Sequence, residues 1–192
     1  MTPSDQEKWN RLYQDGDQNI PVAARVLEEF EYLLPQSGRA LDLACGRGGN
    51  AILLAQHGLE TFAWDISDTA VEQLREFVLD KTLAITVQQR DVVKFPPDPA
   101  SFDVIVVSRF LDRSLIPRLM DALRTQGLIF YQTFIKDKQE GIGPNNPDYL
   151  LDANELLDLF ESLHIMLYRE EGRAGDMSRG FRNEAMLIAR KR

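Results

Sequence analysis

The chain has 192 residues, of which 30 are acidic and 22 basic, and its formal net charge is −8. This balance argues against nucleic acid as a partner, because affinity for it comes largely from Lys and Arg that neutralise phosphates. No apolar run approaches the roughly 20 residues that span a bilayer, and the polar N-terminus has no apolar core of a secretory signal. We therefore expect one domain over residues 1–192, in the cytoplasm and without a membrane partner, while the oligomeric state stays open.

Short apolar runs alternate with segments of helical period, which is typical of parallel strands joined by crossover helices. Expected helices cover residues 22–34, 50–57, 67–79, 114–124 and 152–163, with Ser67 and Asp152 as N-caps and Glu155 completing a capping box. Expected strands cover residues 40–44, 60–64, 83–89, 102–107, 127–134, 164–169 and 185–189. The connection before the last strand is too short for a helical crossover, so the chain is expected to end in an antiparallel hairpin.

A glycine-rich turn, Cys-Gly-Arg-Gly-Gly, follows the first expected strand and opens the next helix. Gly46 and Gly48 allow the backbone to turn sharply and to approach a ligand closely. The same glycines with Ala51 also satisfy the dinucleotide fingerprint, which is weak evidence when it stands alone. Asp42 favours a different ligand, since a carboxylate repels the pyrophosphate of a dinucleotide but attracts the ammonium and sulfonium groups of S-adenosylmethionine.

Acidic residues follow the next two strands. Asp65 ends the second strand roughly 20 residues after the glycines, the spacing at which a carboxylate accepts hydrogen bonds from ribose hydroxyls. Asp91 follows the third strand and could accept from an adenine amino group. Ser108, Arg109 and Phe110 follow the fourth strand, at the edge where open α/β sheets bind ligands.

These segments together resemble the class I, nucleotide-fold S-adenosylmethionine-dependent methyltransferases. The resemblance rests on LDLACGRGGNA, AWDIS, RDV and FDVIVVS, in that order, and spans about residues 39–133. It implies a mostly parallel, three-layer Rossmann-like α/β sheet of order 3-2-1-4-5-7-6, with a cap and helix over residues 1–35 and the core over residues 36–192. The implied cofactor contacts are Asp42, Ala44, Gly46, Gly48, Asn50, Asp65, Ile66, Asp91, Val92, Ser108 and Arg109.

The N-terminal segment Trp9-Asn10-Arg11-Leu12-Tyr13 narrows the resemblance to small bacterial tellurite-resistance-type and thiopurine-type methyltransferases. Their Trp-Asp-x-Arg-Tyr segment lies over the cofactor, and here Asn10 and Leu12 replace the acid and the arginine. The resemblance implies methyl transfer to a small molecule. We name no catalytic base, because the sulfonium is already activated and positioning can supply much of the rate.

Residues 134–149 form a long stretch without a clear helix or strand pattern, directly after the fifth strand. Such stretches in compact domains are usually functional or disordered, so we expect this one to cover the acceptor. The expected acceptor contacts are Trp9, Tyr13, Arg109, Phe110, Phe134 and Tyr149.

Two alternatives stay open, a dinucleotide-dependent oxidoreductase and a non-catalytic module that retains the cofactor pocket. The first is favoured only by the glycine spacing. Cys45 is interpreted as a packed residue, and two isolated histidines without nearby ligand residues predict no metal site.

Overall fold

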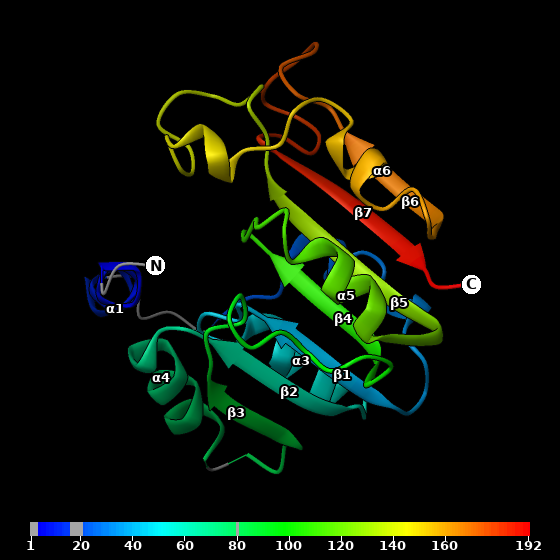
Figure 1. The fold of residues 1–192 in the computed structure, drawn as a ribbon. Helices are drawn as coiled ribbons and strands as arrows, with labels where there is room; N and C mark the ends of the chain where they lie inside the picture. The colour runs from blue at the N-terminus through cyan, green and yellow to red at the C-terminus, as the bar shows by residue number, and fades with distance from the viewer. Residues whose placement is uncertain (1–3, 16–20, 80) are drawn as a thin grey trace.

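The computed structural model describes residues 4–15, 21–79 and 81–192, and its centre is a seven-stranded sheet (Figure 1). The strands lie in the order β3-β2-β1-β4-β5-β7-β6, and β7 is antiparallel to both of its neighbours while the other pairs are parallel. This confirms the predicted order and the terminal hairpin. The strands are β1 (Arg39–Leu43), β2 (Glu60–Asp65), β3 (Ile85–Gln89), β4 (Phe102–Ser108), β5 (Leu123–Phe134), β6 (His164–Glu170) and β7 (Glu184–Arg190).

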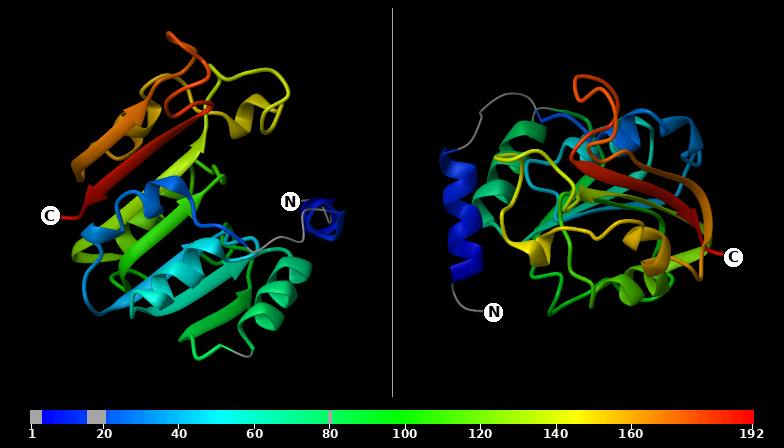
Figure 2. Two further views of the ribbon diagram at one scale, coloured as in Figure 1. Left: turned by 180° about the vertical axis from the view of Figure 1, so that it is seen from behind. Right: turned by 90° about the horizontal axis from the view of Figure 1, so that it is seen from above.

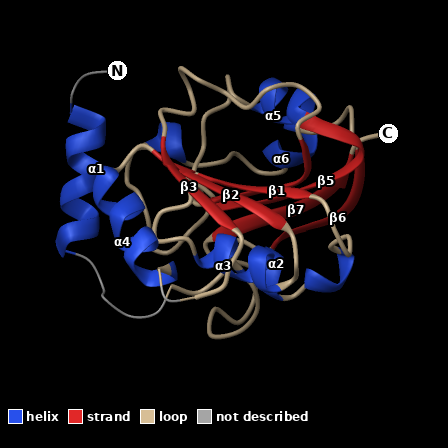
Figure 3. Ribbon diagram, turned by 90° about the horizontal axis from the view of Figure 1, so that it is seen from below, coloured by secondary structure: helices blue, strands red, loops and turns tan. Residues whose placement is uncertain are grey.

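Helices cover both faces of the sheet, with α5 and α6 on one side and α2, α3 and α4 on the other (Figure 3). The central strands β1 and β4 are buried on both faces of the sheet. Apolar residues on each face pack against the helices that cover it, so the core consists of separate clusters. The helical elements are α1 (Ser4–Asp15), α2 (Arg25–Glu28), η1 (Glu31–Leu33), α3 (Gly49–Gln56), α4 (Asp68–Val78), α5 (Ile116–Ala122), η2 (Pro147–Tyr149) and α6 (Glu155–Leu159).

Helix α1 stands outside this layered body and lies beside α4 (Figures 1 and 2). Among the described helices none is long and apolar enough to cross a membrane.

The helix predicted over residues 22–34 is wrong in its extent, because the segment divides into α2 and η1. The amides at its start bond to side chains from other elements: the Ala24 amide donates to Asn50 Oδ1 at 2.7 Å and the Val26 amide to Gln132 Oε1 at 2.8 Å. Phe30, with φ of −125°, then breaks the helical ladder. Tertiary hydrogen bonds therefore override the apolar period of this segment.

The helix predicted over residues 114–124 ends early because β5 begins at Leu123, which pairs with Phe102. Lys191 Nζ closes the helix end by donating to the carbonyls of Met120, Asp121 and Leu123 at 2.8, 3.1 and 2.8 Å. The strand is accordingly longer than the predicted 127–134.

The helix predicted over residues 152–163 is also shorter, and its N-cap is Asn154 in place of Asp152. Asn154 is left-handed, with φ of 64°, so regular helix starts only at Glu155. Half of the expected capping box forms, because Glu155 Oε2 accepts from the Asp152 amide at 2.8 Å, but Asp152 Oδ1 bonds to Lys136. The N-cap predicted at Ser67 is confirmed, since its Oγ accepts from the Ala70 amide at 3.1 Å.

Candidate cofactor and acceptor site

The carboxyl ends of β1 and β2 hold a glycine turn against a buried carboxylate. Asp65 is 5% exposed, and its two oxygens accept from the amides of Gly46 at 2.7 Å and Ser67 at 2.8 Å. Burial raises the pKa of Asp65, and these amide bonds oppose the rise. A carboxylate has about four lone-pair sites, so two amide bonds leave acceptor capacity at the point where the glycine turn begins.

Asp42 lies fully buried inside the same edge of the sheet. Its Oδ1 accepts from Asn50 Nδ2 at 3.1 Å and its Oδ2 from the Ala51 amide at 3.0 Å, so the carboxylate ties β1 to the start of α3. Burial raises its pKa to about 7. Because both oxygens bond within the chain, Asp42 can act on a ligand cation through its charge and by shaping the turn.

Asn50 of α3 bonds to β1, to β4 and to the residue that precedes α2. It is 4% exposed, and besides Asp42 its Nδ2 reaches Ser108 Oγ at 3.1 Å, while its Oδ1 accepts from Ala24. These bonds fix the ends of β1 and β4 relative to each other. Asn50 therefore positions these elements, and its contact with the cofactor stays a prediction.

The glycines of the turn serve different purposes. A Cβ on Gly46, which has φ of 52°, would lie 2.7 Å from the hydroxyl of Tyr13, so this glycine faces the side chain that lies over the turn. A Cβ on Gly48 would instead strike Leu74 of α4 at 2.5 Å. Gly46 therefore fronts the site, and Gly48 allows α3 and α4 to pack together.

After β3, the carboxylate of Asp91 bonds to residues of the turn in which it lies. Asp91 Oδ1 accepts from the amides of Val93 and Lys94, each at 3.2 Å, and its Oδ2 pairs with Lys94 Nζ at 3.1 Å. Val92 is 6% exposed and packs into the core. Ile66 is half-buried beside this turn, and its carbonyl accepts from Gln89 Nε2 at 3.1 Å.

A second group of polar side chains lies farther along the sheet, where β4 and β5 end and β7 begins. Arg109 has a left-handed backbone with φ of 54°, and its Nε donates to Glu184 Oε1 at 2.9 Å. Glu184 is buried, and its other oxygen accepts from Gln132 Nε2. The Arg109 guanidinium carbon lies 5.9 Å from the centre of the Phe134 ring. Sequence reasoning missed Gln132 and Glu184, although an acid opening an otherwise apolar strand was a visible sign.

Helix α1 lies over the glycine turn and is bonded to the start and the side of α4 through polar groups, of which the sequence analysis did not single out Gln73. Asn10 Oδ1 accepts from Ser67 Oγ at 2.7 Å, and Gln73 Nε2 donates to the Tyr13 carbonyl at 3.1 Å. Trp9 stacks on Tyr13 with ring centroids 6.2 Å apart. Burial, followed by the charge of Asp65, raises the pKa of the Tyr13 hydroxyl above its ordinary range.

The same helix also meets the segment 134–149. Lys8 Nζ lies 5.3 Å from the centre of the Tyr149 ring, so two parts of the chain that are distant in sequence touch above the sheet edge. Phe110, which was predicted to touch the acceptor, packs partly against the core, and its carbonyl accepts from Tyr131 Oη at 2.8 Å.

The segment 134–149 is anchored at both ends. Ile135 forms an isolated bridge with Leu151, and the Gln139 amide donates to Asn183 Oδ1 at 2.8 Å. At the far end, Arg113 donates to the carbonyls of Asp148 and Leu150 at 2.8 and 3.0 Å. The residues between these anchors are mostly exposed.

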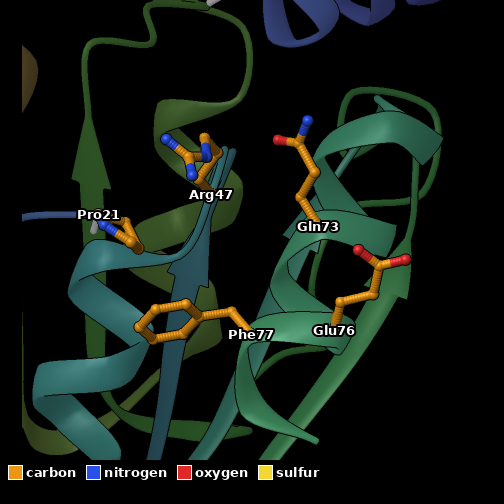
Figure 4. A pocket seen from close by; sticks show the side chains of 5 residues that line it. All are labelled: Pro21, Arg47, Gln73, Glu76 and Phe77. Carbon is orange, nitrogen blue, oxygen red and sulfur yellow. The ribbon is translucent and has the colours of Figure 1, made fainter. Parts of the chain in front are cut away.

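A pocket of about 290 Å³ lies between the glycine turn and α4 (Figure 4). Arg47 points into it from the turn and Gln73, Glu76 and Phe77 from α4, with Pro21 closing one end. None of these residues is among the predicted cofactor contacts, but Arg47 stands between Gly46 and Gly48, and Gln73 bonds to the carbonyl of Tyr13.

Comparisons with known proteins find a family model that matches part of this chain and solved structures that share its fold. Residues 40–127 match the family model described as a methyltransferase domain. A protein of Bacillus subtilis (strain 168) called YqeM, for which methyltransferase activity is proposed, is 34% identical over 80 residues. That match covers 41% of this chain and 31% of YqeM, so the chain spans less than a third of this relative.

Solved structures share the whole fold at low identity. TehB from Haemophilus influenzae has a TM-score of 0.70 and 20% identity, over 96% of this chain and 67% of TehB. A geranyl diphosphate C-methyltransferase from Streptomyces coelicolor A3(2), solved with Mg²⁺, geranyl diphosphate and S-adenosyl-L-homocysteine, has a TM-score of 0.73 and 13% identity, over 97% of each chain. These likenesses confirm the class I methyltransferase fold that the sequence predicted.

Proposed function

Because residues 40–127 match a methyltransferase domain family, we propose that this chain transfers the methyl group of S-adenosylmethionine to a small-molecule acceptor. The observation that carries the proposal is the pair of buried carboxylates, Asp42 and Asp65, at the ends of β1 and β2 around the Gly46 turn. Buried carboxylates are costly unless a positive group accompanies them. A cofactor that brings an ammonium and a sulfonium meets that need.

The donor set of the turn fits this cofactor. Gly46 offers a backbone surface without a side chain, and Asp65 retains lone pairs for two ribose hydroxyls. We assign the ribose to Asp65, the methionine end to the turn between Ala44 and Gly46, and the adenine to the rim formed by Ile66, Asp91 and Val92. Asp42 and Asn50 act by holding this turn and the Ser108 end of β4 in place.

The main task of the protein in this reaction is to position the acceptor relative to the methyl group. The cofactor supplies an activated methyl group, so the acceptor needs to be held in line with it, and positioning of this kind contributes roughly 7–11 kcal/mol to lowering a barrier. Arg109 and Phe134 are neighbours at the carboxyl ends of β4 and β5, and Tyr149 contacts Lys8 of α1. We place the acceptor there, under α1 and the segment 134–149, which exclude water when they close over it.

A nicotinamide dinucleotide is the weaker ligand for this site. Its pyrophosphate would lie at the start of α3, next to the buried carboxylate of Asp42. The terminal antiparallel hairpin, β6 and β7, also departs from the dehydrogenase plan. The chain could still bind the cofactor without turning it over, and release of S-adenosylhomocysteine from labelled cofactor against a metabolite panel distinguishes an enzyme from such a module.

The test of the cofactor site measures S-adenosylhomocysteine binding by calorimetry, with one site per chain expected. Asp65→Ala should weaken binding by about 1–3 kcal/mol, because the ribose hydroxyls lose their acceptor. Since Asp65 also holds the Gly46 turn, a 2′,3′-dideoxy analogue of the ligand separates the two causes.

Wild type should prefer the natural ligand over the analogue, and Asp65→Ala should bind both alike. The exposed Asp68→Asn serves as the matched control and should behave as wild type. An Asp65→Ala variant that still discriminates between the two ligands would refute the ribose assignment, and a wild-type chain that binds neither would refute the proposed function.

A further inference from the structure

The backbone of Arg109 is held in an unusual conformation at the end of β4. Its φ of 54° lies in the left-handed region, which residues other than glycine rarely adopt. The Arg109 amide donates to the Gln132 carbonyl at 2.8 Å, so the chain leaves β4 still bonded to β5. Strain of this kind persists where surrounding contacts fix it, and it is concentrated at functional sites.

A chain of hydrogen bonds fixes where the Arg109 side chain goes. The Val26 amide donates to Gln132 Oε1, which forces Gln132 Nε2 to face Glu184. Glu184, whose side chain is only 8% exposed, then accepts from Arg109 Nε. The guanidinium is thereby set over β5 and β7, two strands away from the Gly46 turn on β1.

Only one edge of the guanidinium is used by these contacts. The bond to Glu184 comes from Nε, and neither terminal nitrogen donates to any residue in the described ranges 4–15, 21–79 and 81–192. The side chain is 65% exposed, and the Phe134 ring lies beside it. Two terminal nitrogens in one plane match the two oxygens of a carboxylate or phosphate.

We propose that Arg109 binds an anionic oxygen group, a carboxylate or phosphate, on the methyl acceptor, and that Gln132 and Glu184 position it for this. This inference rests on the proposed function, because it takes the β4–β5 edge as the acceptor side. It assigns Arg109 to the acceptor and not to the cofactor. Glu184 offsets part of the charge of Arg109, so the selectivity comes from the paired donors and their fixed direction.

The test uses the full chain saturated with S-adenosylhomocysteine and titrates sodium acetate or inorganic phosphate at constant ionic strength, with sodium chloride as the reference. The readout is the backbone amide resonances of Ser108 and Phe110, which flank Arg109. Wild type should show a saturable shift with at least one of the two oxoanions that chloride does not reproduce. The ion that binds more tightly then identifies the group.

Arg109→Met should abolish the saturable shift, and Arg109→Lys, which keeps the charge but not the planar pair of donors, should weaken it by roughly fivefold or more. Arg118→Met, at an exposed position on α5, should match wild type. Glu184→Gln should also weaken the shift, because the guanidinium loses its anchor.

Binding of S-adenosylhomocysteine to Arg109→Met should stay within about threefold of wild type, which separates this inference from the cofactor proposal. Shifts that are linear for both ions, or that persist unchanged in Arg109→Met, would overturn it. If wild type fails to bind S-adenosylhomocysteine, the cofactor proposal fails, and the same ion titration on the unliganded chain decides the role of Arg109.

Discussion

The hydroxyl of Tyr13 lies over Gly46 so closely that a Cβ added to this glycine would come within 2.7 Å of it. Tyr13 belongs to α1, and Gly46 belongs to the turn after β1, 33 residues later. The contact therefore couples the position of α1 to the backbone that we expect to hold the cofactor.

Gly46→Ala should lower both stability and S-adenosylhomocysteine affinity. A left-handed alanine costs about 1–2 kcal/mol, and the new methyl group must also displace Tyr13. Gly58→Ala is the matched control, because Gly58 has φ of 100° but a Cβ added there would meet nothing within 4 Å. Urea denaturation should show losses in both variants, whereas calorimetry should show weaker ligand binding only for Gly46→Ala. Equal affinities in the two variants would contradict the placement of the cofactor beside Gly46.

Buried Asp42 should make stability depend on pH. Its pKa rises from 3.8 to about 7, mainly through burial. Below pH 3.8 the Asp42 carboxyl is protonated in both the folded and the unfolded chain. Between pH 3.8 and about 7 it is protonated in the folded chain but ionised in the unfolded chain, so the free energy of unfolding falls as pH rises. Above about pH 7 the stabilising contribution is lost. Asp65, whose pKa is also raised by burial, acts in the same direction.

Urea denaturation between pH 5 and 8.5 measures this effect, and Asp42→Asn should decline less steeply than wild type over that range. A ligand ammonium favours ionised Asp42, so S-adenosylhomocysteine affinity in wild type should rise with pH in the same window. Parallel stability profiles for the two proteins would show that Asp42 does not titrate there.

Arg113 is expected to be a structural clamp. Its guanidinium pairs with both oxygens of Glu155 and bonds to the carbonyls of Asp148 and Leu150. Arg113→Met should lower the free energy of unfolding by about 1–2 kcal/mol, a modest value because the side chain is 38% exposed and solvent screens the pair. Arg118→Met controls for loss of a surface arginine, and an equal loss in both variants would argue against the clamp.

The sequence predicted the central strands well because their short apolar runs are buried on both faces, as in β4. It overextended three helices, and in two of them the bonds that interrupt the helix are long-range. Asn50 and Gln132 cap the start of α2 from elsewhere in the fold, and Lys191 closes α5 from the far end of the chain. The helical spacing of apolar residues within one segment cannot reveal hydrogen-bond partners from distant parts of the chain.

The same limit applies to the site. The spacing of the motifs predicted that Asp42, Gly46 and Asp65 lie at one edge of the sheet, and the structure has them there. Spacing could not show that the Asp42 carboxylate is already occupied by Asn50 and Ala51, or that Arg109 pairs with Glu184, 75 residues later. Whether these residues contact the cofactor stays a prediction, and so does the subgroup resemblance of the N-terminal segment.

The segment 134–149 should act as a cover whose middle moves while its ends stay fixed. Its ends are held by the Ile135–Leu151 bridge and by Arg113. Between them, a Cβ on Gly141 would meet nothing within 4 Å, whereas Gly143 rests against the Phe134 ring. Tyr149 adds a contact to Lys8 of α1. Ordering of α1 by the cofactor should therefore be transmitted to this segment.

Limited trypsin digestion tests that coupling. Cleavage after Lys138, which is followed by exposed Gln139, should slow when S-adenosylhomocysteine is added, and slow further with a productive acceptor, because closure buries the segment. Cleavage after Lys81, exposed beyond α4, provides the internal control and should change less. Lys8→Met, which removes the contact with Tyr149, should reduce the protection of Lys138 without altering cleavage at Lys81. Protection that is equal at both lysines would indicate general stabilisation by the ligand, and no protection at Lys138 would leave the segment an ordinary surface loop.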